Sequence, residues 1–308
     1  MASPIDTAST VEQFIRAGAT LLDEAGLAFG HGTDNALDDA AELVFFAAGL
    51  RHEEAPQAYS RRLTETQRSA VRHLLERRLR ERLPTAYLTH RMWFAGHEFY
   101  VDERVLVPRS PIAELIEAGF EPWIEADRVR RLVDIGTGSG CIAIAAALAL
   151  PHATVDAVDV SVAALEVTQM NIARHGVAAT VRGVLSDVYA GLGSAHYDVI
   201  VSNPPYVSVA EMQTLPEEYR SEPELGLRAG TDGLDIVRRL LAGAAEHLNP
   251  EGILVVEVGD SEEALVAACP SVPFTWLEFE RGGGGVFLLT AGQVKEHDRA
   301  LKRLAEGP

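Results

Sequence analysis

The chain has 308 residues, of which 47% are hydrophobic and 23% are charged. Its mass of 33.2 kDa leaves room for one large or two ordinary domains with a sizeable buried core. Lys and Arg together number 27 and Asp and Glu number 45, so the formal net charge is −18. This charge argues against a general binder of nucleic-acid backbones, and it suits either a basic protein partner or simply a solvated acidic surface.

Cysteine usage and apolar runs indicate a cytoplasmic protein. Cys141 and Cys269 lie far apart and outside any Cys-x-x-Cys spacing, so we expect neither a disulfide nor a zinc site. The longest wholly apolar run, residues 141–150, has ten residues, about half the length of a membrane-spanning helix. The first thirty residues lack the basic stretch and apolar core of a signal peptide. We therefore expect no membrane contact.

The N-terminal part, residues 1–85, is predicted to be a helical domain. Apolar residues recur there at the spacing of one helix face: Val71, Leu74, Leu75 and Leu79. The stretch 61–82 also holds eight Arg against three Glu. A solvated helix face is the simpler interpretation, and a patch that binds RNA or carboxylates is the alternative. This stretch is the one place where we expect nucleic-acid contact to be possible. Pro84 is predicted to end the helix, because its ring fixes φ and it lacks an N–H.

Residues 86–108 are predicted to link two domains. Aromatic and β-branched residues surround Gly96, and this pattern favours a β-hairpin over 87–107. The run Pro108-Arg-Ser-Pro111 then begins a helix that extends to about Phe120. The second domain is expected to span 109–308.

From Arg131 onwards, short apolar runs alternate with helical patterns. The predicted strands are 131–135, 154–158, 180–184, 197–202, 252–258, 274–280 and 285–290. The predicted helices between them are 139–150, 161–175, 232–247 and 261–268. Such alternation is typical of an α/β fold with a doubly wound parallel sheet. The last two strands are joined by the short segment 281–285, so we expect them to be antiparallel neighbours.

A glycine-rich turn follows the first predicted strand of this domain. It has the sequence Val133-Asp-Ile-Gly-Thr-Gly-Ser-Gly140 and leads into a predicted helix. Glycine permits a tight turn and close approach of a ligand to the backbone. The glycines are spaced two and two, whereas a dinucleotide fingerprint ends three residues beyond its second glycine. This shorter form is the one found in class I S-adenosylmethionine methyltransferases, although a purely structural turn remains the alternative.

Acidic residues follow or end three successive strands. Asp159 lies 19 residues after Gly140, where a carboxylate can accept both ribose hydroxyl protons. Asp187 follows the third strand and could accept from an adenine amino group, with Val188 lining the face of the ring. Asp134 lies under the glycine turn, where it could order the loop or hold an ammonium group. One such acid alone could be a helix cap, but three in a row favour a nucleoside pocket.

The fourth strand is followed by Asn203-Pro204-Pro205-Tyr206. The two prolines stiffen the backbone and remove two N–H donors. The Asn203 side-chain oxygen and the Pro204 carbonyl remain as acceptors for both hydrogens of a planar NH₂ group. Tyr206 could stack on a planar substrate. A proline-rich loop without a function is the alternative.

This arrangement suits methyl transfer to an amide or to an exocyclic amine. The lone pair of either nitrogen is delocalised, so orientation and hydrogen bonding in the transition state are needed more than a strong base. The sequence has no evident Ser–His–Asp or Cys–His arrangement and no metal-ligand spacing. We therefore expect no metal.

These motifs resemble those of a known family, the N5-glutamine protein methyltransferases. Asp134-Ile-Gly-Thr-Gly-Ser-Gly140 is similar to its cofactor motif and Asn203-Pro-Pro-Tyr206 to its substrate motif. The resemblance covers roughly residues 20–290 and includes Phe29-Gly-His-Gly-Thr-Asp34, residues 101–111, residues 215–227 and residues 272–279. The branch that modifies release factors generally has Asp- or Glu-type residues after its Pro-Arg. Here Ser110-Pro111 follows Arg109, which favours the branch that acts on a ribosomal protein.

The resemblance implies a Rossmann-like class I methyltransferase domain over 109–308, with a smaller helical domain over 1–85 and a hairpin linker over 86–108. It implies methylation at N5 of a glutamine in large-subunit ribosomal protein L-three, a basic partner that the N-terminal helices help to recognise. The residues that it assigns to S-adenosylmethionine are Asp134, Gly136, Thr137, Gly138, Ser139, Gly140, Asp159, Asp187, Val188 and Asn203. The residues that it assigns to the substrate glutamine are Asn203, Pro204, Pro205 and Tyr206.

Three other functions stay open. The first is modification of a release factor, and the second is methylation of adenine N6 in DNA or RNA, which would need a basic groove beside the pocket. The third is a non-enzymatic assembly factor with a degenerate domain, which the complete set of motif residues disfavours.

Overall fold

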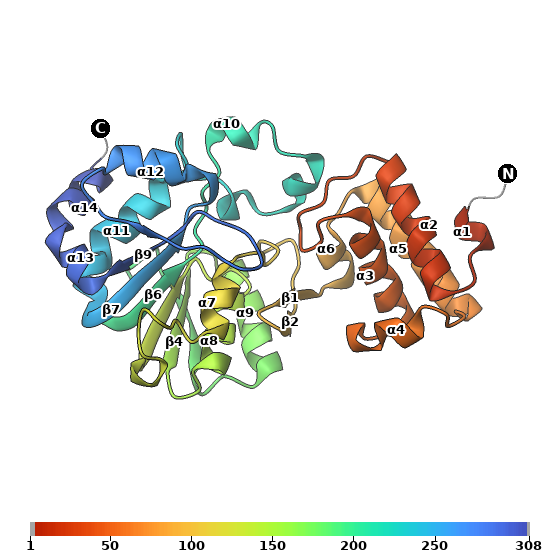
Figure 1. The fold of residues 1–308 in the computed structure, drawn as a ribbon, viewed down its shortest axis with the longest axis horizontal. Helices are drawn as coiled ribbons and strands as arrows, with labels where there is room; N and C mark the ends of the chain where they lie inside the picture. Colours follow the sequence, from red (N-terminus) through yellow and green to blue (C-terminus); the bar gives the residue numbers. More distant parts are fainter. Residues whose placement is uncertain (1–3, 307–308) are drawn as a thin grey trace. The chain divides into compact units, whose positions relative to one another are not determined.

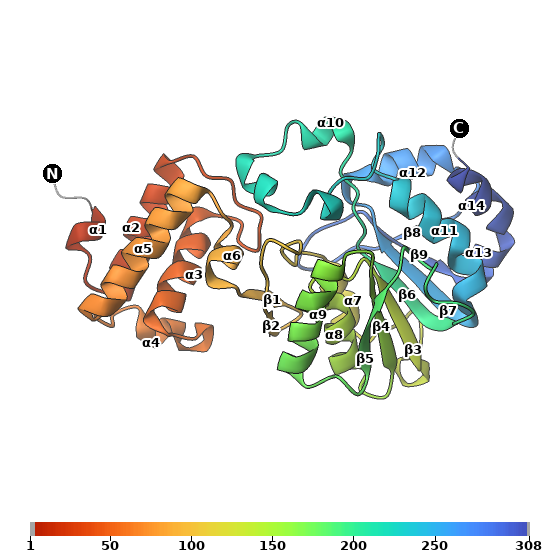
Figure 2. The same cartoon turned by 180° about the vertical axis from the view of Figure 1, so that it is seen from behind.

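A computed structural model describes residues 4–306 of the chain. It divides into two compact units (Figures 1 and 2). The first extends to Met92 and also includes Pro216–Ser221, and the second consists of Trp93–Leu215 and the residues from Glu222 onwards. The boundaries expected from the sequence, at residues 85 and 108, do not assign Pro216–Ser221 to the first unit. No local pattern in the sequence indicates it.

The first unit is helical, as the periodicity predicts. Its helices are α1 (Pro4–Thr7), α2 (Val11–Glu24), α3 (Ala36–Ala48), α4 (Ala55–Ala58), α5 (Glu65–Glu81) and α6 (Thr85–Thr89), with the short 3₁₀ helices η1 (His52–Glu54) and η3 (Glu217–Ser221). Thr10 and Thr64 form capping boxes with Gln13 and Gln67 at the starts of α2 and α5. The predicted apolar face of α5 is buried, except that Leu79 is half-buried.

A buried ion pair joins two helices of this unit. The Arg78 guanidinium donates to the Asp39 carboxylate at 2.8 Å, and both side chains are almost fully buried. Helix α5 ends at Glu81 because Arg82 takes a left-handed conformation with φ of +52°. Pro84 therefore precedes the next helix, α6, instead of ending α5 directly.

The segment Pro216–Ser221 belongs to the helical unit through buried contacts. Glu218 is fully buried and accepts from the Ala28 backbone N–H at 3.1 Å. It also accepts from Arg82 at 2.7 Å. The rings of Tyr219 and His31 lie 4.2 Å apart. These contacts fix part of the loop after Tyr206 to the N-terminal helices.

The predicted hairpin is shorter than the sequence pattern suggests. It consists of β1 (Met92–Phe94) and β2 (His97–Phe99), joined through Gly96 with φ of +75°. Residues 87–89 are part of helix α6, so predicting strand there was wrong. Residues 100–107 form no strand and are held instead by side chains, since Asn171 accepts from the Tyr100 N–H at 2.8 Å. β-Propensity is a weak guide where tertiary contacts decide.

Within the described residues, the second unit is built on a seven-stranded sheet in the order β5-β4-β3-β6-β7-β9-β8. The strands are β3 (Arg131–Ile135), β4 (Thr154–Asp159), β5 (Val181–Leu185), β6 (Tyr197–Ser202), β7 (Leu248–Glu257), β8 (Thr275–Trp276) and β9 (Val286–Thr290). β9 is antiparallel to both β7 and β8, and the other pairs are parallel. The predicted α/β fold and the antiparallel last pair are confirmed. The strand predicted over 274–280 is only two residues long.

Helices cover both faces of this sheet (Figures 1 and 2). The helices of this unit are α7 (Ile112–Glu117), α8 (Cys141–Ala149), α9 (Val162–His175), α10 (Val209–Met212), α11 (Asp235–His247), α12 (Glu262–Ala268), α13 (Ala291–Glu296) and α14 (Asp298–Ala305), with 3₁₀ helices η2 (Ala126–Arg128), η4 (Glu224–Gly226) and η5 (Gly259–Ser261). Of these, α10 lies in a loop beyond the ends of the strands and covers neither face (Figures 1 and 2). Successive strand residues point to opposite faces. Leu132 therefore packs in the core with α7, α8 and α9, and Val133 packs in the core with α11 to α14.

The strand order reverses between β3 and β6, which are adjacent in the sheet but not in sequence. In open α/β sheets, ligands bind outside the carboxyl ends of the strands at such a switch point. The glycine turn follows β3 and the Asn203–Tyr206 motif follows β6, so both lie at this position. Within residues 4–306, no helix combines the length and apolar composition needed to cross a lipid bilayer.

Candidate active site

A pocket opens at the carboxyl ends of β3, β4 and β6. Its walls include most of the residues predicted from the sequence: Gly136, Thr137, Gly138, Ser139, Asp159, Asp187, Val188, Asn203, Pro204 and Pro205. Asp134, Gly140 and Tyr206 do not line it. Asp134 and Gly140 each form a hydrogen bond with Thr137, which does, and Tyr206 directly follows the lining residue Pro205. The pocket lies entirely within the second unit.

The glycine turn has a backbone that other residues would strain. Gly136, Gly138 and Gly140 have φ of +78°, +55° and +82°. A Cβ atom at Gly140 would also lie 2.9 Å from the Thr168 Cγ2 on α9. The turn therefore needs glycine both for its conformation and for its packing, and its backbone is left open toward the pocket.

Asp134 lies behind this turn and is 0% exposed. Its Oδ2 accepts from the Thr137 hydroxyl at 2.6 Å and from the Ala143 N–H at 3.2 Å. Its Oδ1 is buried and has no hydrogen-bond partner in the described part of the chain. Burial raises the pKa of Asp134 to about 7, although the bonds from Thr137 and Ala143 lower it. A cation brought to Oδ1 would favour the ionised carboxylate.

Asp159 ends β4 and faces the pocket. Its two oxygens accept from the Gly138 N–H at 2.9 Å and from the Ser161 N–H at 2.8 Å. Burial raises the pKa of Asp159, against the lowering effect of these backbone bonds. Each oxygen has a further lone pair, so the carboxylate can accept from a ligand hydroxyl as well.

The third acid is placed differently. The Asp187 side chain is 55% exposed and its Oδ2 lies 2.8 Å from the Arg239 guanidinium. Val188 beside it is buried and has φ of +52°. Asp187 therefore lies at the edge of the pocket, where it already forms an ion pair with Arg239, and Val188 forms part of an apolar wall. The sequence alone does not indicate the pairing with Arg239.

The Asn203–Tyr206 motif lies against the glycine turn. The Ser202 hydroxyl donates to the Ile135 carbonyl at 2.6 Å and holds the ends of β6 and β3 together. A Cβ at Gly136 would lie 3.9 Å from the Asn203 carbonyl oxygen. The cofactor motif and the substrate motif predicted from the sequence are therefore adjacent.

Tyr206 is held away from the pocket walls. Its hydroxyl donates to the Glu257 carboxylate at 3.1 Å. Its ring packs on Gly259, where a Cβ would lie only 2.6 Å from the ring Cε2. Burial raises the pKa of Tyr206, and the nearby Glu257 carboxylate raises it further. The structure therefore gives the ring a supporting contact, and stacking of Tyr206 on the substrate stays a prediction.

The segment 104–110 forms another wall of the pocket, which sequence reasoning did not predict. Arg109 within it donates two hydrogen bonds to the buried Glu222 carboxylate, at 2.6 and 2.7 Å. Glu222 also accepts from the Val107 N–H at 3.0 Å. Pro223 and Leu225, which follow Glu222, line the same pocket. The motifs that carry the family resemblance include these residues, and that is the signal by which they could have been found.

The arginine-rich stretch 61–82 is largely paired with carboxylates. Six of its arginines form ion pairs in the described part of the chain: Arg68 and Arg72 with Glu65, Arg77 and Arg80 with Glu81, Arg78 with Asp39, and Arg82 with Glu217 and Glu218. Neutralised arginines have less attraction for a phosphate backbone. This pairing favours the solvated helix face over an RNA-binding patch.

The pocket combines a glycine turn without side chains over its backbone, carboxylates, and the acceptor oxygens of Asn203 and Pro204. Asn203 lines it, and its carboxamide makes no hydrogen bond to any other described residue. Its oxygen is therefore available to a ligand N–H. Such a site can bind a nucleoside with a cationic group and hold a planar NH₂ beside it.

Sequence comparisons give similar proteins over almost the whole chain. Residues 121–217 match the family model described as methyltransferase small domain. The chain is 49% identical to the ribosomal protein uL3 glutamine methyltransferase of Xylella fastidiosa (strain 9a5c), over 97% of this chain and 96% of that protein. It is 47% identical to the protein of the same name from Neisseria meningitidis serogroup B, over 93% of this chain and 94% of that protein.

Solved structures include more distant similarities. A methyltransferase from Pyrococcus furiosus is 23% identical with a TM-score of 0.46, and the match covers 63% of this chain and 88% of that chain. The human methyltransferase 10 domain containing protein is 18% identical with a TM-score of 0.45, over 64% of this chain and 89% of that chain.

Proposed function

Because the chain belongs to the family of ribosomal protein uL3 glutamine methyltransferases, we propose that it methylates the side-chain amide nitrogen of a glutamine in uL3, the large-subunit protein L-three. The methyl donor is S-adenosylmethionine. The observation that carries the proposal is the adjacency of the glycine turn and the Asn203–Tyr206 motif at one pocket. Donor and acceptor of the methyl group must meet at such a junction.

The residues of the pocket fit this cofactor. Asp159 would accept the ribose hydroxyl protons, and Val188 would contact the adenine ring. The buried and unpartnered Oδ1 of Asp134 would balance the charge of the ammonium group. The open backbone of the turn from Gly136 to Gly140 leaves room for the amino-acid part. When bound, S-adenosylmethionine supplies an electrophilic methyl group with a neutral thioether as leaving group.

The Asn203 motif would hold the substrate glutamine. Its side-chain oxygen and the Pro204 carbonyl accept the two amide hydrogens, which turns the nitrogen lone pair toward the methyl carbon. These acceptors support the loss of amide planarity as the nitrogen forms its new bond. One N–H proton is released to water when the amide is methylated. No residue of the motif is required to act as a strong base.

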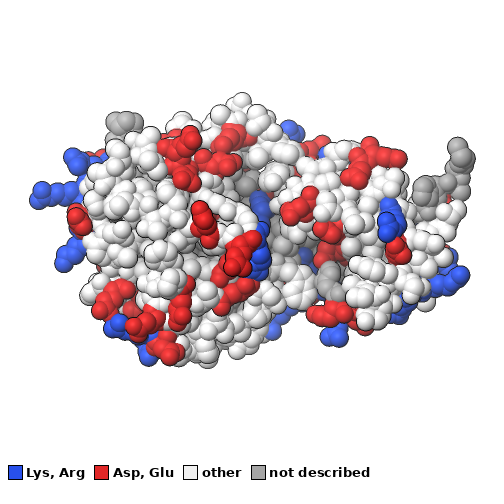
Figure 3. Space-filling model, in the orientation of Figure 1, with Lys and Arg blue, Asp and Glu red and all other residues white. Residues whose placement is uncertain are grey.

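The partner is a basic ribosomal protein in this proposal. Acidic side chains are spread over the face of the molecule seen in Figure 3, in keeping with the net charge of −18. Charge complementarity speeds encounter with a cationic protein. We infer that the enzyme acts in the cytoplasm on newly made uL3, and that the N-terminal helical unit recognises the substrate. Because six arginines of 61–82 are paired with carboxylates, the proposal does not include contact with ribosomal RNA.

The direct test is methyl transfer to purified, unassembled uL3. The full chain is incubated with methyl-labelled S-adenosylmethionine and uL3, and peptides are mapped by tandem mass spectrometry. We expect one glutamine to carry one methyl group on its amide nitrogen. Absence of label from every glutamine of uL3 would falsify the proposal.

A competition assay separates the alternative substrates. Equal amounts of uL3, a release factor and an adenine-containing oligonucleotide are offered in one reaction. We expect uL3 to be labelled first, because the relatives named above are uL3 enzymes at 47% to 49% identity. If the release factor or adenine N6 is labelled before uL3, that molecule and not uL3 is the preferred substrate.

A further inference from the structure

A buried carboxylate lies directly behind the Asn203–Tyr206 motif. Glu257, the last residue of β7, is only 4% exposed. Its Oε2 accepts from the Ser110 hydroxyl at 2.5 Å, and its Oε1 accepts from the Tyr206 hydroxyl at 3.1 Å. One carboxylate therefore joins the segment that forms a pocket wall to the motif that is expected to hold the substrate.

We propose that Glu257 is a positioning residue for methyl transfer, which holds the Asn203–Tyr206 motif in register with the wall formed by residues 104–110. The inference rests on the proposed function. Glu257 itself does not line the pocket, so it acts through Tyr206 and Ser110.

Tyr206 is closely packed, so a residue that holds it in place can affect the position of the whole motif. A Cβ at Gly259 would clash with its ring, and a Cβ at Gly233 would lie 2.3 Å from its carbonyl oxygen. Two prolines separate Tyr206 from Asn203, and their fixed φ angles allow little independent movement between these two residues. We infer that a displacement of the Tyr206 backbone is transmitted to the backbone of Asn203 and so changes the position of its carboxamide. Misplacement of a reacting group by about 1 Å can lower the rate about 100-fold.

Glu257 must be ionised to accept from both hydroxyls at once. Burial raises the pKa of Glu257 to about 7, although the bonds from Ser110 and Tyr206 and the charge of Arg109 lower it. Arg109 is itself held by Glu222, and Asp260 also faces Tyr206. On β9, the register partner of Glu257 is the uncharged Val286. As the pH falls through about 7, a proton on one oxygen removes an acceptor, so the positioning should weaken.

The test compares Glu257→Gln with a matched control on the same strand. Glu251→Gln removes an exposed carboxylate that pairs with Arg128 at 2.7 Å. We expect Glu257→Gln to lower kcat on uL3 by about 10- to 100-fold, with the dissociation constant for S-adenosylmethionine changed less than about twofold. Glu251→Gln should leave kcat unchanged. An unchanged kcat in Glu257→Gln overturns the inference.

Two readouts separate positioning from a general structural role. The acid limb of the kcat profile, with an apparent pKa near 7 in the native enzyme, should flatten in Glu257→Gln. Tyr206→Phe should also lower kcat, and adding it to Glu257→Gln should have little further effect, because both remove the same contact. An unaltered acid limb, or fully additive losses, contradicts action through Tyr206.

Hydrogen–deuterium exchange tests the inference without any substrate. The amides of residues 206–208 should exchange about tenfold faster in Glu257→Gln than in Glu251→Gln. If the native enzyme fails to label uL3 but this exchange difference appears, the proposed function fails and the positioning stands. If uL3 is labelled and neither kcat nor exchange responds to Glu257→Gln, the positioning fails and the function stands.

Discussion

Two buried aspartates on neighbouring strands of the sheet have opposite electrostatic surroundings. Asp156 on β4 accepts from Arg182 at 2.5 Å and from Tyr197 at 2.7 Å. Burial alone would raise the pKa of Asp156, but these bonds and the nearby arginines lower it. Asp134 on β3 lies one register position closer to the pocket, and no described residue places a cation beside it. Burial raises its pKa to about 7.

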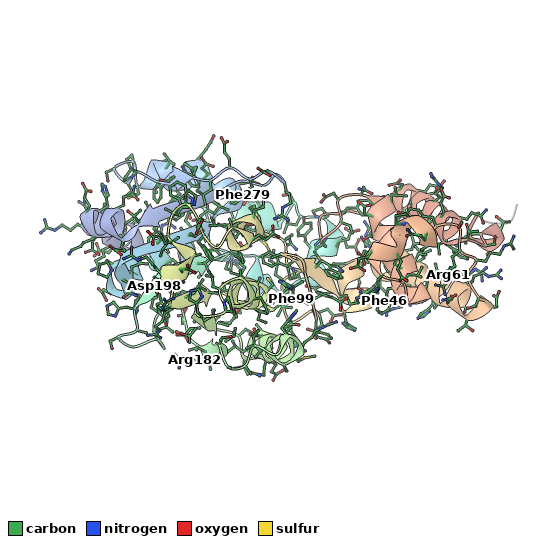
Figure 4. The ribbon with its side chains drawn as sticks, turned by 60° about the horizontal axis from the view of Figure 1, so that its bottom comes forward. Phe46, Arg61, Phe99, Arg182, Asp198 and Phe279 are labelled. Atoms are coloured by element: carbon green, nitrogen blue, oxygen red, sulfur yellow. The ribbon has the colours of Figure 1, made fainter. Side chains whose placement is uncertain are left out.

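A similar contrast holds between acids near the amino end of the sheet and two buried acids near its carboxyl end. At the amino end, Asp198 accepts from the backbone N–H groups of Arg130 and Arg131 at 2.7 and 2.9 Å. Arg182 on the neighbouring strand β5 donates to Asp156, and Figure 4 labels both Asp198 and Arg182. At the carboxyl end, Asp134 and Glu257 are buried and form no ion pair with another described residue, although the charge of Arg109 lowers the pKa of Glu257. Matched acids stabilise the fold. A buried acid that forms no ion pair destabilises the free protein, and a cationic ligand can remove that cost by binding beside it.

The largest expected effect comes from the substrate motif. Asn203→Ala should lower kcat about 1000-fold, because in the proposed mechanism it removes an acceptor that acts in the transition state. The dissociation constant for S-adenosylmethionine should change less than about twofold. Steady-state kinetics with uL3 and calorimetric titration of the cofactor measure the two quantities. Equal loss of both would mean that Asn203 mainly binds the cofactor.

A matched asparagine at the other end of the sheet supplies the control. Asn249 donates to Asp198 at 2.7 Å and lies outside the pocket. Asn249→Ala should leave kcat unchanged and lower the free energy of unfolding by about 1 kcal/mol, measured by urea denaturation. A large loss of activity in this variant would show that the two ends of the sheet are not independent.

The two aspartates give the next largest effect. Asp134→Asn should raise the dissociation constant for S-adenosylmethionine about 10- to 100-fold, because it removes the negative charge available to the ammonium group. Asp156→Asn should leave that constant unchanged and lower the free energy of unfolding by about 2 kcal/mol, a modest value since its arginine partners are substantially exposed. Titration calorimetry and denaturation distinguish these outcomes. If Asp156→Asn weakens cofactor binding, the two aspartates do not have the separate roles that their surroundings indicate.

Sequence patterns predict the parts of this molecule that are determined locally. The apolar face of α5, the alternation of strands and helices and the short link before β9 all follow from neighbouring residues. The glycine turn and the acids at strand ends follow in the same way, since parallel strands bring their carboxyl ends to one edge. These elements fixed the fold class and most of the pocket walls.

Long-range contacts account for what the patterns missed. Ser110 and Glu257 are 147 residues apart, and Arg109 and Glu222 are 113 residues apart. No local periodicity encodes such pairs. A charged residue at the end of the apolar run 252–258 was nevertheless a usable signal for Glu257, as it was for Asp159. The helix over 85–89 was missed because its aromatic and β-branched residues have a weak preference that burial overrides.

The smallest effect is the response of cofactor affinity to pH. The pKa of Asp134 is about 7 in the free protein, and a bound ammonium group favours the ionised carboxylate. Below that pH, binding must release a proton, so affinity weakens as the pH falls. We expect the dissociation constant for S-adenosylmethionine to rise by up to about tenfold from about pH 7.5 to about pH 6. Calorimetric titration at several pH values measures it.

Variants identify the titrating group that causes this pH dependence of cofactor affinity. Asp134→Asn should flatten most of the slope, and a smaller slope should remain because burial also raises the pKa of Asp159. Asp156→Asn should keep the full slope, since the pKa of Asp156 lies below its ordinary value. The contribution of Asp134 to the stability of the free protein should in turn fall as the pH rises from about 4 to about 7, where folded Asp134 retains a proton that the unfolded chain has lost. A slope that Asp134→Asn leaves intact would place the titrating group elsewhere and remove the electrostatic contrast between the two strands.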